Sequence, residues 1–172
     1  MHPLLTTDLI HAFRTDGVTL IRGMFADCVE PLRDGVAFNL QHPGPYAAEN
    51  LSDTESGRFF DDYCNWQRIP AFEEVIKAPE VAQAAAALMG SQTVQLFHDH
   101  VLVKAPGTRQ RTPWHQDQPY YDVEGQQNVS FWIPVDPVAK QDCLELIAGT
   151  HRGPWLMPRS FLDHQAKWFP EG

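Results

Sequence analysis

The chain has 172 residues, 43% hydrophobic and 11% aromatic, which is enough for one domain with its own apolar core. Its 13 Lys and Arg against 22 Asp and Glu give a formal net charge of -9, which repels phosphate backbones and anionic membrane surfaces. Composition therefore argues against nucleic acid and membranes as partners. We expect a single domain over 1–172, mainly helical over 1–90 and made of strands over 91–172.

The first predicted elements are a helix and a strand. Thr7 is placed to cap a short helix, and Gly17 is placed to end it, since serine and threonine favour the start of helices and glycine their end. The apolar, β-branched run 18–21 then predicts a strand.

Two further helices are predicted in the first half. Asp27 and Glu30 form a capping box for a second helix, which the Pro-Gly-Pro sequence at 43–45 closes. Pro79 suits the first turn of a third helix over 81–89, which Gly90 ends. The stretch 46–70 has little periodicity, and we interpret it as a loop.

The second half predicts a sheet. Segments rich in β-branched and aromatic residues alternate there with Pro, Gly, Asn and Asp, a spacing typical of a sandwich or jelly roll. The predicted strands are 94–104, 114–121, 129–135 and 144–147. Helices followed by strands indicate an α+β fold.

The cysteines and the chain start bear on localisation. Cys28, Cys64 and Cys143 are odd in number and form no CxxC pair, so they predict reduced thiols rather than a disulfide framework or a zinc site. The first residues lack a signal peptide's basic and apolar regions, and no apolar run could span a bilayer. We therefore expect a cytoplasmic protein.

The strongest candidate for chemistry is the pair His115 and Asp117. On a strand, residues two apart leave the same face, so this imidazole and this carboxylate can converge on one ion as two thirds of a 2-His-1-carboxylate triad. A His-x-Asp sequence is common by chance, so its surroundings must decide.

Those surroundings carry a family resemblance. Lys-Ala-Pro-Gly begins at Lys104, Thr-Pro-Trp-His-Gln-Asp-Gln at Thr112, Phe-Trp-Ile-Pro at Phe131, and Cys-Leu-Glu-Leu-Ile-Ala-Gly-Thr-His-Arg at Cys143. In this order and spacing the segments resemble the phytanoyl-CoA dioxygenase family of Fe(II)/2-oxoglutarate-dependent oxygenases. The resemblance implies a double-stranded β-helix core, the jelly roll of cupin-like proteins, behind N-terminal helices.

The resemblance also implies an activity and a site. His115 and Asp117 would bind Fe(II), and 2-oxoglutarate and O2 would serve to hydroxylate a small organic substrate, the expected partner. His98, His100 and Trp132 would line the 2-oxoglutarate pocket, although strand histidines are often structural and Trp132 can belong to the core. The residues that could face the substrate, or simply pack, are Gln116, Gln118, Tyr120 and Tyr121.

The third metal ligand is missing from the pattern. The distal histidine of the family, and the arginine after it that binds 2-oxoglutarate, have no counterpart here, and the family's histidine at the position of His151 is not a ligand. His151 and His164 remain the candidates. The chain therefore reads as incomplete at its C-terminus: a fragment, a trimmed chain, or a truncation completed by a homo-oligomer or another subunit.

Two rival functions follow from the same residues. A cupin-type metalloprotein could bind a metal through three histidines, His98, His100 and His115. A truncated, inactive module could keep the oxygenase fold without its chemistry. The sequence holds no G-x-S-x-G, P-loop or G-x-G-x-x-G motif, which argues against hydrolases and nucleotide-binding enzymes.

Overall fold

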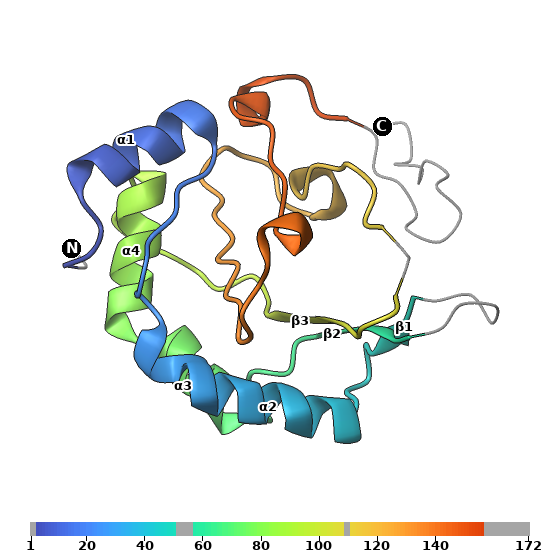
Figure 1. Ribbon diagram of the computed structural model, residues 1–172. Helices are drawn as coiled ribbons and strands as arrows, with labels where there is room; N and C mark the ends of the chain where they lie inside the picture. The colour runs from blue at the N-terminus through green and yellow to red at the C-terminus, as the bar shows by residue number, and fades with distance from the viewer. Residues whose placement is uncertain (1–2, 51–56, 109–110, 157–172) are drawn as a thin grey trace.

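The computed structural model describes residues 3–50, 57–108 and 111–156 and shows an α+β arrangement (Figure 1). The helices are α1 (Thr7–Asp16), α2 (Val29–Gln41), α3 (Pro70–Lys77) and α4 (Pro79–Met89). The strands are β1 (Ala48–Glu49), β2 (Phe59–Tyr63) and β3 (His100–Lys104), which form one antiparallel sheet in that order. Single turns of 3-10 helix are η1 (Ala26–Cys28), η2 (Gln118–Tyr120), η3 (Lys140–Asp142) and η4 (Thr150–Arg152).

The helices form an arc, and the second half of the chain lies inside it (Figure 1). One core joins α2 and α3 to the sheet, and its buried side chains are Leu32, Phe60, Ile69, Phe72, Val75 and Val101. A smaller core joins α1 to α4 around Leu5, Ala84 and Leu88. The sheet is therefore supported by helices on one face, while the other face turns towards the second half of the chain.

Three predicted helices are confirmed, but two of their caps differ from the prediction. Helix α1 is capped by Thr6, whose hydroxyl accepts from the Leu9 amide at 3.3 Å, and not by Thr7. The predicted capping box of α2 is wrong, because Asp27 lies in η1 and the helix begins at Val29 without a side-chain cap. Helix α4 starts at Pro79, and Gly90 ends it in the left-handed region, as predicted.

The interpretation of 46–70 as a loop is wrong. Within it lie β1 and β2, and Pro70 begins α3 as Pro79 begins α4, by filling a first-turn position that needs no amide hydrogen. The sheet therefore takes two of its three strands from the part of the chain that we expected to be mainly helical.

Most of the predicted strands are absent from the described residues. Only 100–104 of the first is a strand, and 18–21, 114–121, 129–135 and 144–147 form no ladder. A strand needs a neighbour to take its backbone hydrogen bonds, and the described part of the chain offers these segments none. No jelly roll is therefore seen among the described residues.

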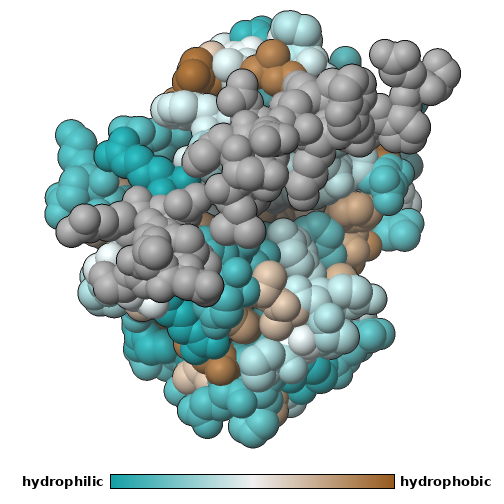
Figure 2. Space-filling view, turned by 90° about the vertical axis from the view of Figure 1, so that its right-hand side faces the viewer, coloured by the Kyte–Doolittle hydropathy of each residue, from teal (hydrophilic) through white to brown (hydrophobic). Residues whose placement is uncertain are grey.

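Without a sheet, these segments expose apolar side chains. Figure 2 shows brown hydrophobic patches among the teal surface on one face of the molecule. Large apolar side chains from the segments predicted as strands are more than half exposed, among them Trp114, Trp132, Leu144, Leu146 and Ile147. Their apolar character, from which we predicted strands, does not produce burial within the described structure.

A buried polar cluster fixes the end of β2. The Asp62 side chain is 0% exposed, and its carboxylate accepts from Asn39 Nδ2 at 2.8 Å, the Gly44 amide at 2.7 Å and the Tyr63 amide at 2.9 Å. A Cβ at Gly44 would stand 2.5 Å from Asn65 Oδ1, so only glycine allows this approach. The cluster ties α2 and the following loop to the strand.

Burial acts on the Asp62 carboxyl in the opposite direction to its hydrogen bonds. Burial alone would raise its pKa, but the bonds from Asn39, Gly44, Asn65 and Tyr63 outweigh this and hold the pKa below the ordinary value. Asp62 is therefore a carboxylate that the fold stabilises in its charged form.

No described helix is both long and apolar enough to cross a membrane.

Candidate functional site

The candidate site lies on the sheet face that the helices do not cover. In β2, Phe60 and Asp62 point to the helices, so Asp61 and Tyr63 point the other way. Tyr63 stands directly opposite His100 of β3 in the antiparallel register. Directly paired residues share a sheet face, so His100 lies beside Tyr63.

His115 and Asp117 converge as the sequence predicts, although they lie in an irregular segment rather than a strand. His115 Nε2 is 3.2 Å from Asp117 Oδ1. The other ring nitrogen, Nδ1, is 2.8 Å from the Pro113 carbonyl oxygen, to which it must donate. The carbonyl therefore holds the ring so that Nε2 faces the carboxylate.

The two groups shift each other's titration. The hydrogen bond to Asp117 raises the pKa of His115 above its ordinary value, with burial acting in the opposite direction. The same bond lowers the pKa of Asp117, and the charges of His100 and His98 act in the same direction. The hydrogen bond to His115 is thus the main cause that keeps Asp117 ionised against the opposing effect of burial.

His98 and His100 are brought to the same place as Asp117. The Tyr63 ring stacks on the His100 ring with centroids 3.9 Å apart and planes at 16°, and meets His98 edge-on at 5.4 Å. Tyr121 also meets the His98 ring edge-on, at 5.7 Å. The two histidines therefore stand in an aromatic wall beside the predicted ligand pair.

Sequence reasoning missed Tyr63 and Asp61. Burial raises the pKa of Tyr63 to about 12, with further contributions from Asp61, Tyr121 and Asp117, so the phenol keeps its proton. Asp61 Oδ2 is 3.4 Å from His100 Nε2. The sequence Phe-Phe-Asp-Asp-Tyr of this strand shows no strict apolar–polar alternation, so its periodicity gave no strand signal.

The structure gives Gln116 and Gln118 bracing contacts. The Gln116 amide donates to the Pro154 carbonyl at 3.3 Å and accepts from the Leu156 amide at 2.7 Å. Gln118 donates to the Val123 carbonyl at 2.6 Å. These contacts hold the segments that follow the ligand pair, and a role towards substrate remains a prediction for both.

The other predicted site residues differ in position. Tyr120 meets the His115 ring edge-on at 5.9 Å. The Trp132 side chain is 55% exposed, so it does not belong to the core, and its place in a pocket wall remains a prediction. His151 lies at the end of α1, where Nε2 is 3.2 Å from the Arg14 carbonyl oxygen. His164 lies outside the described residues.

No third ligand joins the pair among the residues that the structure describes, since no three His, Cys, Asp or Glu side chains gather in a metal-binding group there. By the same finding, His98, His100 and His115 do not form a three-histidine metal site in the described structure. His115 and Asp117 are therefore a pair of predicted ligands, and the described residues supply no third one.

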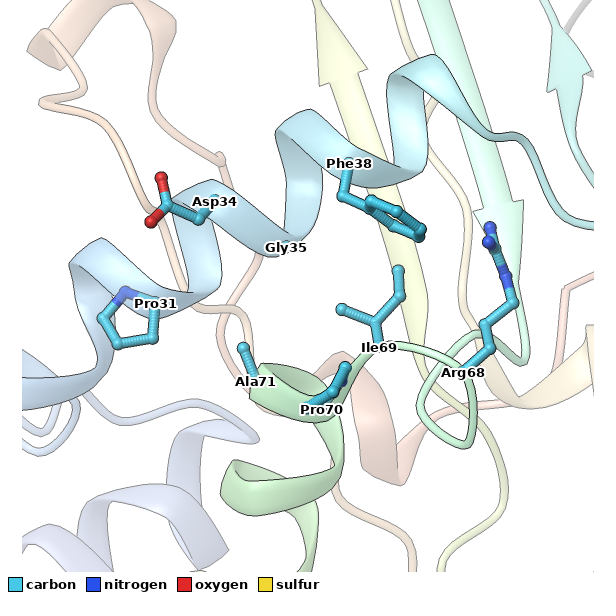
Figure 3. Close-up of a pocket in the computed structure, with 8 residues that line it drawn as sticks. All are labelled: Pro31, Asp34, Gly35, Phe38, Arg68, Ile69, Pro70 and Ala71. Atoms are coloured by element: carbon cyan, nitrogen blue, oxygen red, sulfur yellow. The ribbon is translucent and has the colours of Figure 1, made fainter.

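One pocket of the described structure lies apart from these residues. A cavity of about 350 Å³ lies between α2 and the start of α3, lined by Asp34, Gly35 and Phe38 on one side and by Arg68, Ile69, Pro70 and Ala71 on the other (Figure 3). None of the predicted site residues lines it. Because none of the predicted site residues reaches it, we do not assign it to the proposed chemistry.

The family of the chain follows from its sequence as a whole. The family model described as phytanoyl-CoA dioxygenase (PhyH) matches residues 13–169. No curated protein and no solved structure matches the chain. The matched region contains both predicted ligands and the β2–β3 sheet behind them. The family is one of oxygenases typically dependent on Fe(II) and 2-oxoglutarate, and the chain belongs to it.

Proposed function

We propose that this protein is an Fe(II)/2-oxoglutarate-dependent dioxygenase that hydroxylates a small organic molecule. The observation that carries the proposal is the approach of His115 Nε2 to Asp117 Oδ1 at 3.2 Å, with Nδ1 bound to the Pro113 carbonyl. Metal-binding histidines commonly donate their other nitrogen to such a carbonyl, which fixes the coordinating nitrogen.

The residues present fit two positions of the proposed iron site. His115 and Asp117 would hold the cation in place of the proton that they now share, and the raised pKa of His115 and the lowered pKa of Asp117 both follow from the hydrogen bond between them. Two protein ligands, with a third still to be identified, would leave positions for the co-substrates. When bound, the iron would bring 2-oxoglutarate and O2 together for substrate oxidation.

The surrounding residues would then shape the pocket. Tyr63, Tyr121 and His98 would form an aromatic wall on one side of this pocket. His98 and His100 would supply polar contacts to 2-oxoglutarate. Gln116 and Gln118 would keep the adjoining segments in place.

A second candidate function is an inactive module of the same family. It is favoured because no described residue joins His115 and Asp117 as a third metal ligand. Such a protein would keep the His115–Asp117 pair without turnover.

Turnover of 2-oxoglutarate separates these candidates. Each cycle should convert 2-oxoglutarate, O2 and one C–H bond of the substrate into succinate, CO2 and a C–OH group. We expect succinate formation that requires Fe(II) and falls by more than about 100-fold in Asp117→Ala, beyond the 10–100-fold typical of outer-shell losses. Asp122→Ala, an exposed aspartate nearby, is the matched control. Succinate at equal rates in both variants would contradict the assignment, and none from the unaltered chain would favour the inactive module.

A further inference from the structure

Lys104, at the end of β3, contacts both the neighbouring strand and the segment that carries the predicted ligands. It pairs with Phe59 of β2 in the antiparallel register, and directly paired residues share a sheet face. Its Nζ lies over the Phe59 ring, 4.3 Å from the centroid, and donates to Thr112 Oγ1 at 2.8 Å. Because Phe59 is only 3% exposed, a fixed aromatic ring supports one side of the ammonium group.

The bond from Lys104 to Thr112 closes a loop whose other end is also fixed. The Ala105 amide and the Thr108 hydroxyl both donate to the Arg58 carbonyl oxygen, at 2.8 and 2.9 Å. These bonds attach the start of the loop to the residue before β2. Lys104 joins the end of β3 to a residue eight positions further along the chain. The loop therefore leaves the sheet and returns to it at Thr112.

The short segment from Thr112 to His115 has little conformational freedom. The ring of Pro113 fixes its φ angle, and the residue before a proline is restricted to extended conformations. The Pro113 carbonyl oxygen lies 2.8 Å from His115 Nδ1. No backbone–backbone hydrogen bond holds residues 111–114 within the described structure. A shift of Thr112 would therefore also shift the carbonyl that orients the His115 ring.

We propose that Lys104 is a positioning residue that, through Thr112 and Pro113, keeps His115 facing Asp117. The consequence for metal binding rests on the proposed function, whereas the loop closure does not, because its contacts exist in the protein without metal. As a cation, Lys104 opposes Fe(II) binding by its charge. If it acted through charge alone, its removal would raise Fe(II) affinity, so a fall in affinity reports the positioning.

The first test measures the mobility of the loop end in the metal-free protein. Lys104→Met removes the donor and keeps the aliphatic chain, and Thr112→Val removes the acceptor and keeps the shape. In each variant the 15N order parameters of the Trp114 and His115 amides should fall from about 0.85, typical of rigid backbone, towards the flexible range below about 0.6. Lys104→Arg and Thr112→Ser keep the donor and the acceptor and should keep the rigid values.

The second test measures Fe(II) affinity by anaerobic equilibrium dialysis. Lys104→Met and Thr112→Val should each weaken binding about tenfold, the lower end of the loss that follows removal of groups behind a metal ligand. The double variant should lose no more than either single variant, because both remove the same bond. Lys104→Arg should stay within about twofold. Lys140→Met, at an exposed lysine of η3, removes the same charge and is the matched control, with both readouts unchanged.

The two tests fail in different ways. Unchanged order parameters in both Lys104→Met and Thr112→Val would overturn the loop closure. Lower order parameters with an unchanged or higher Fe(II) affinity would overturn the role of Lys104 at the metal site. If the unaltered chain binds no Fe(II), the proposed iron site fails, while the order parameters still decide whether Lys104 positions the loop.

Discussion

Gly17 and His151 lie against each other at the C-terminal end of α1. A Cβ at Gly17 would stand 2.4 Å from His151 Nδ1, and the other ring nitrogen is 3.2 Å from the Arg14 carbonyl oxygen. Arg152 Nη2 and the Gly149 amide each lie 2.8 Å from the next two carbonyls of the helix, those of Thr15 and Asp16. The η4 turn therefore satisfies carbonyls that a helix end leaves unpaired.

This contact predicts an unusually large cost for Gly17→Ala. Gly17 and Gly23 both adopt a left-handed φ, of 81° and 78°, but nothing lies within 4 Å of a Cβ at Gly23. Urea unfolding should show a loss of about 1 kcal/mol for Gly23→Ala from backbone strain alone. Gly17→Ala should lose at least about 1 kcal/mol more, because His151 must also move. Equal losses would mean that the His151 contact does not constrain this position.

The second prediction separates His151 from the metal. His151→Ala should lower the free energy of unfolding by about 1 kcal/mol, since it removes a donor from the helix end. Fe(II) affinity should stay within about twofold of the unaltered chain, because the ring is bound to α1. The two values come from urea unfolding and anaerobic equilibrium dialysis. Loss of Fe(II) binding without loss of stability would instead make His151 the third ligand.

The third prediction concerns the buried Asp62. Asp62→Ala leaves the Asn39, Gly44 and Tyr63 donors without their acceptor, and it should cost about 3 kcal/mol of unfolding free energy. Asp34→Ala, at an exposed aspartate of α2, should stay within about 0.5 kcal/mol. Similar losses for both would show that the polar cluster contributes little to stability.

The same carboxylate predicts an acid-sensitive stability. Because the folded protein holds the pKa of Asp62 below its ordinary value of 3.8, the stabilisation is fully present above that value. It is lost as pH falls towards the folded pKa. The difference in unfolding free energy between the unaltered chain and Asp62→Asn should therefore shrink below about pH 3.8. A difference that grows on acidification would contradict the assigned direction.

The fourth prediction tests the brace between Gln116 and the segment that follows η4. Gln116→Ala removes the acceptor of the Leu156 amide, so hydrogen exchange at that amide should become faster. Gln126→Ala, at an exposed glutamine, should leave it unchanged. If Leu156 keeps its protection in Gln116→Ala, another group holds this segment.

The helices were largely predictable because their signals are local. Gly17, Pro79 and Gly90 act through their own backbone conformations, which hold in any tertiary setting. The strands were not predictable in the same way, because a strand depends on a partner strand that can be distant in sequence. Leu144 and Ile147 read as strand residues, yet they lie more than half exposed in a segment without a ladder.

The candidate site was predictable only as far as its motif. His115 and Asp117 follow from their spacing and surroundings. Tyr63 and Asp61 lie far away in the sequence, and only the pairing of β2 with β3 brings them to His100. The sequence around Asp61 does not indicate which distant strand it pairs with. The contacts of Asp61 and Tyr63 with His100 therefore could not be predicted from one sequence.

The most direct test of the account is the visible charge-transfer absorption of the anaerobic chain with Fe(II) and 2-oxoglutarate, measured for the unaltered chain, His115→Ala and His151→Gln. The account predicts a band for the unaltered chain and His151→Gln, and none for His115→Ala. A band that survives in His115→Ala would contradict the assignment of the His115–Asp117 pair as the iron-binding centre, and a band that is lost in His151→Gln while the fold remains intact would contradict the structural role of His151 and make it the third ligand.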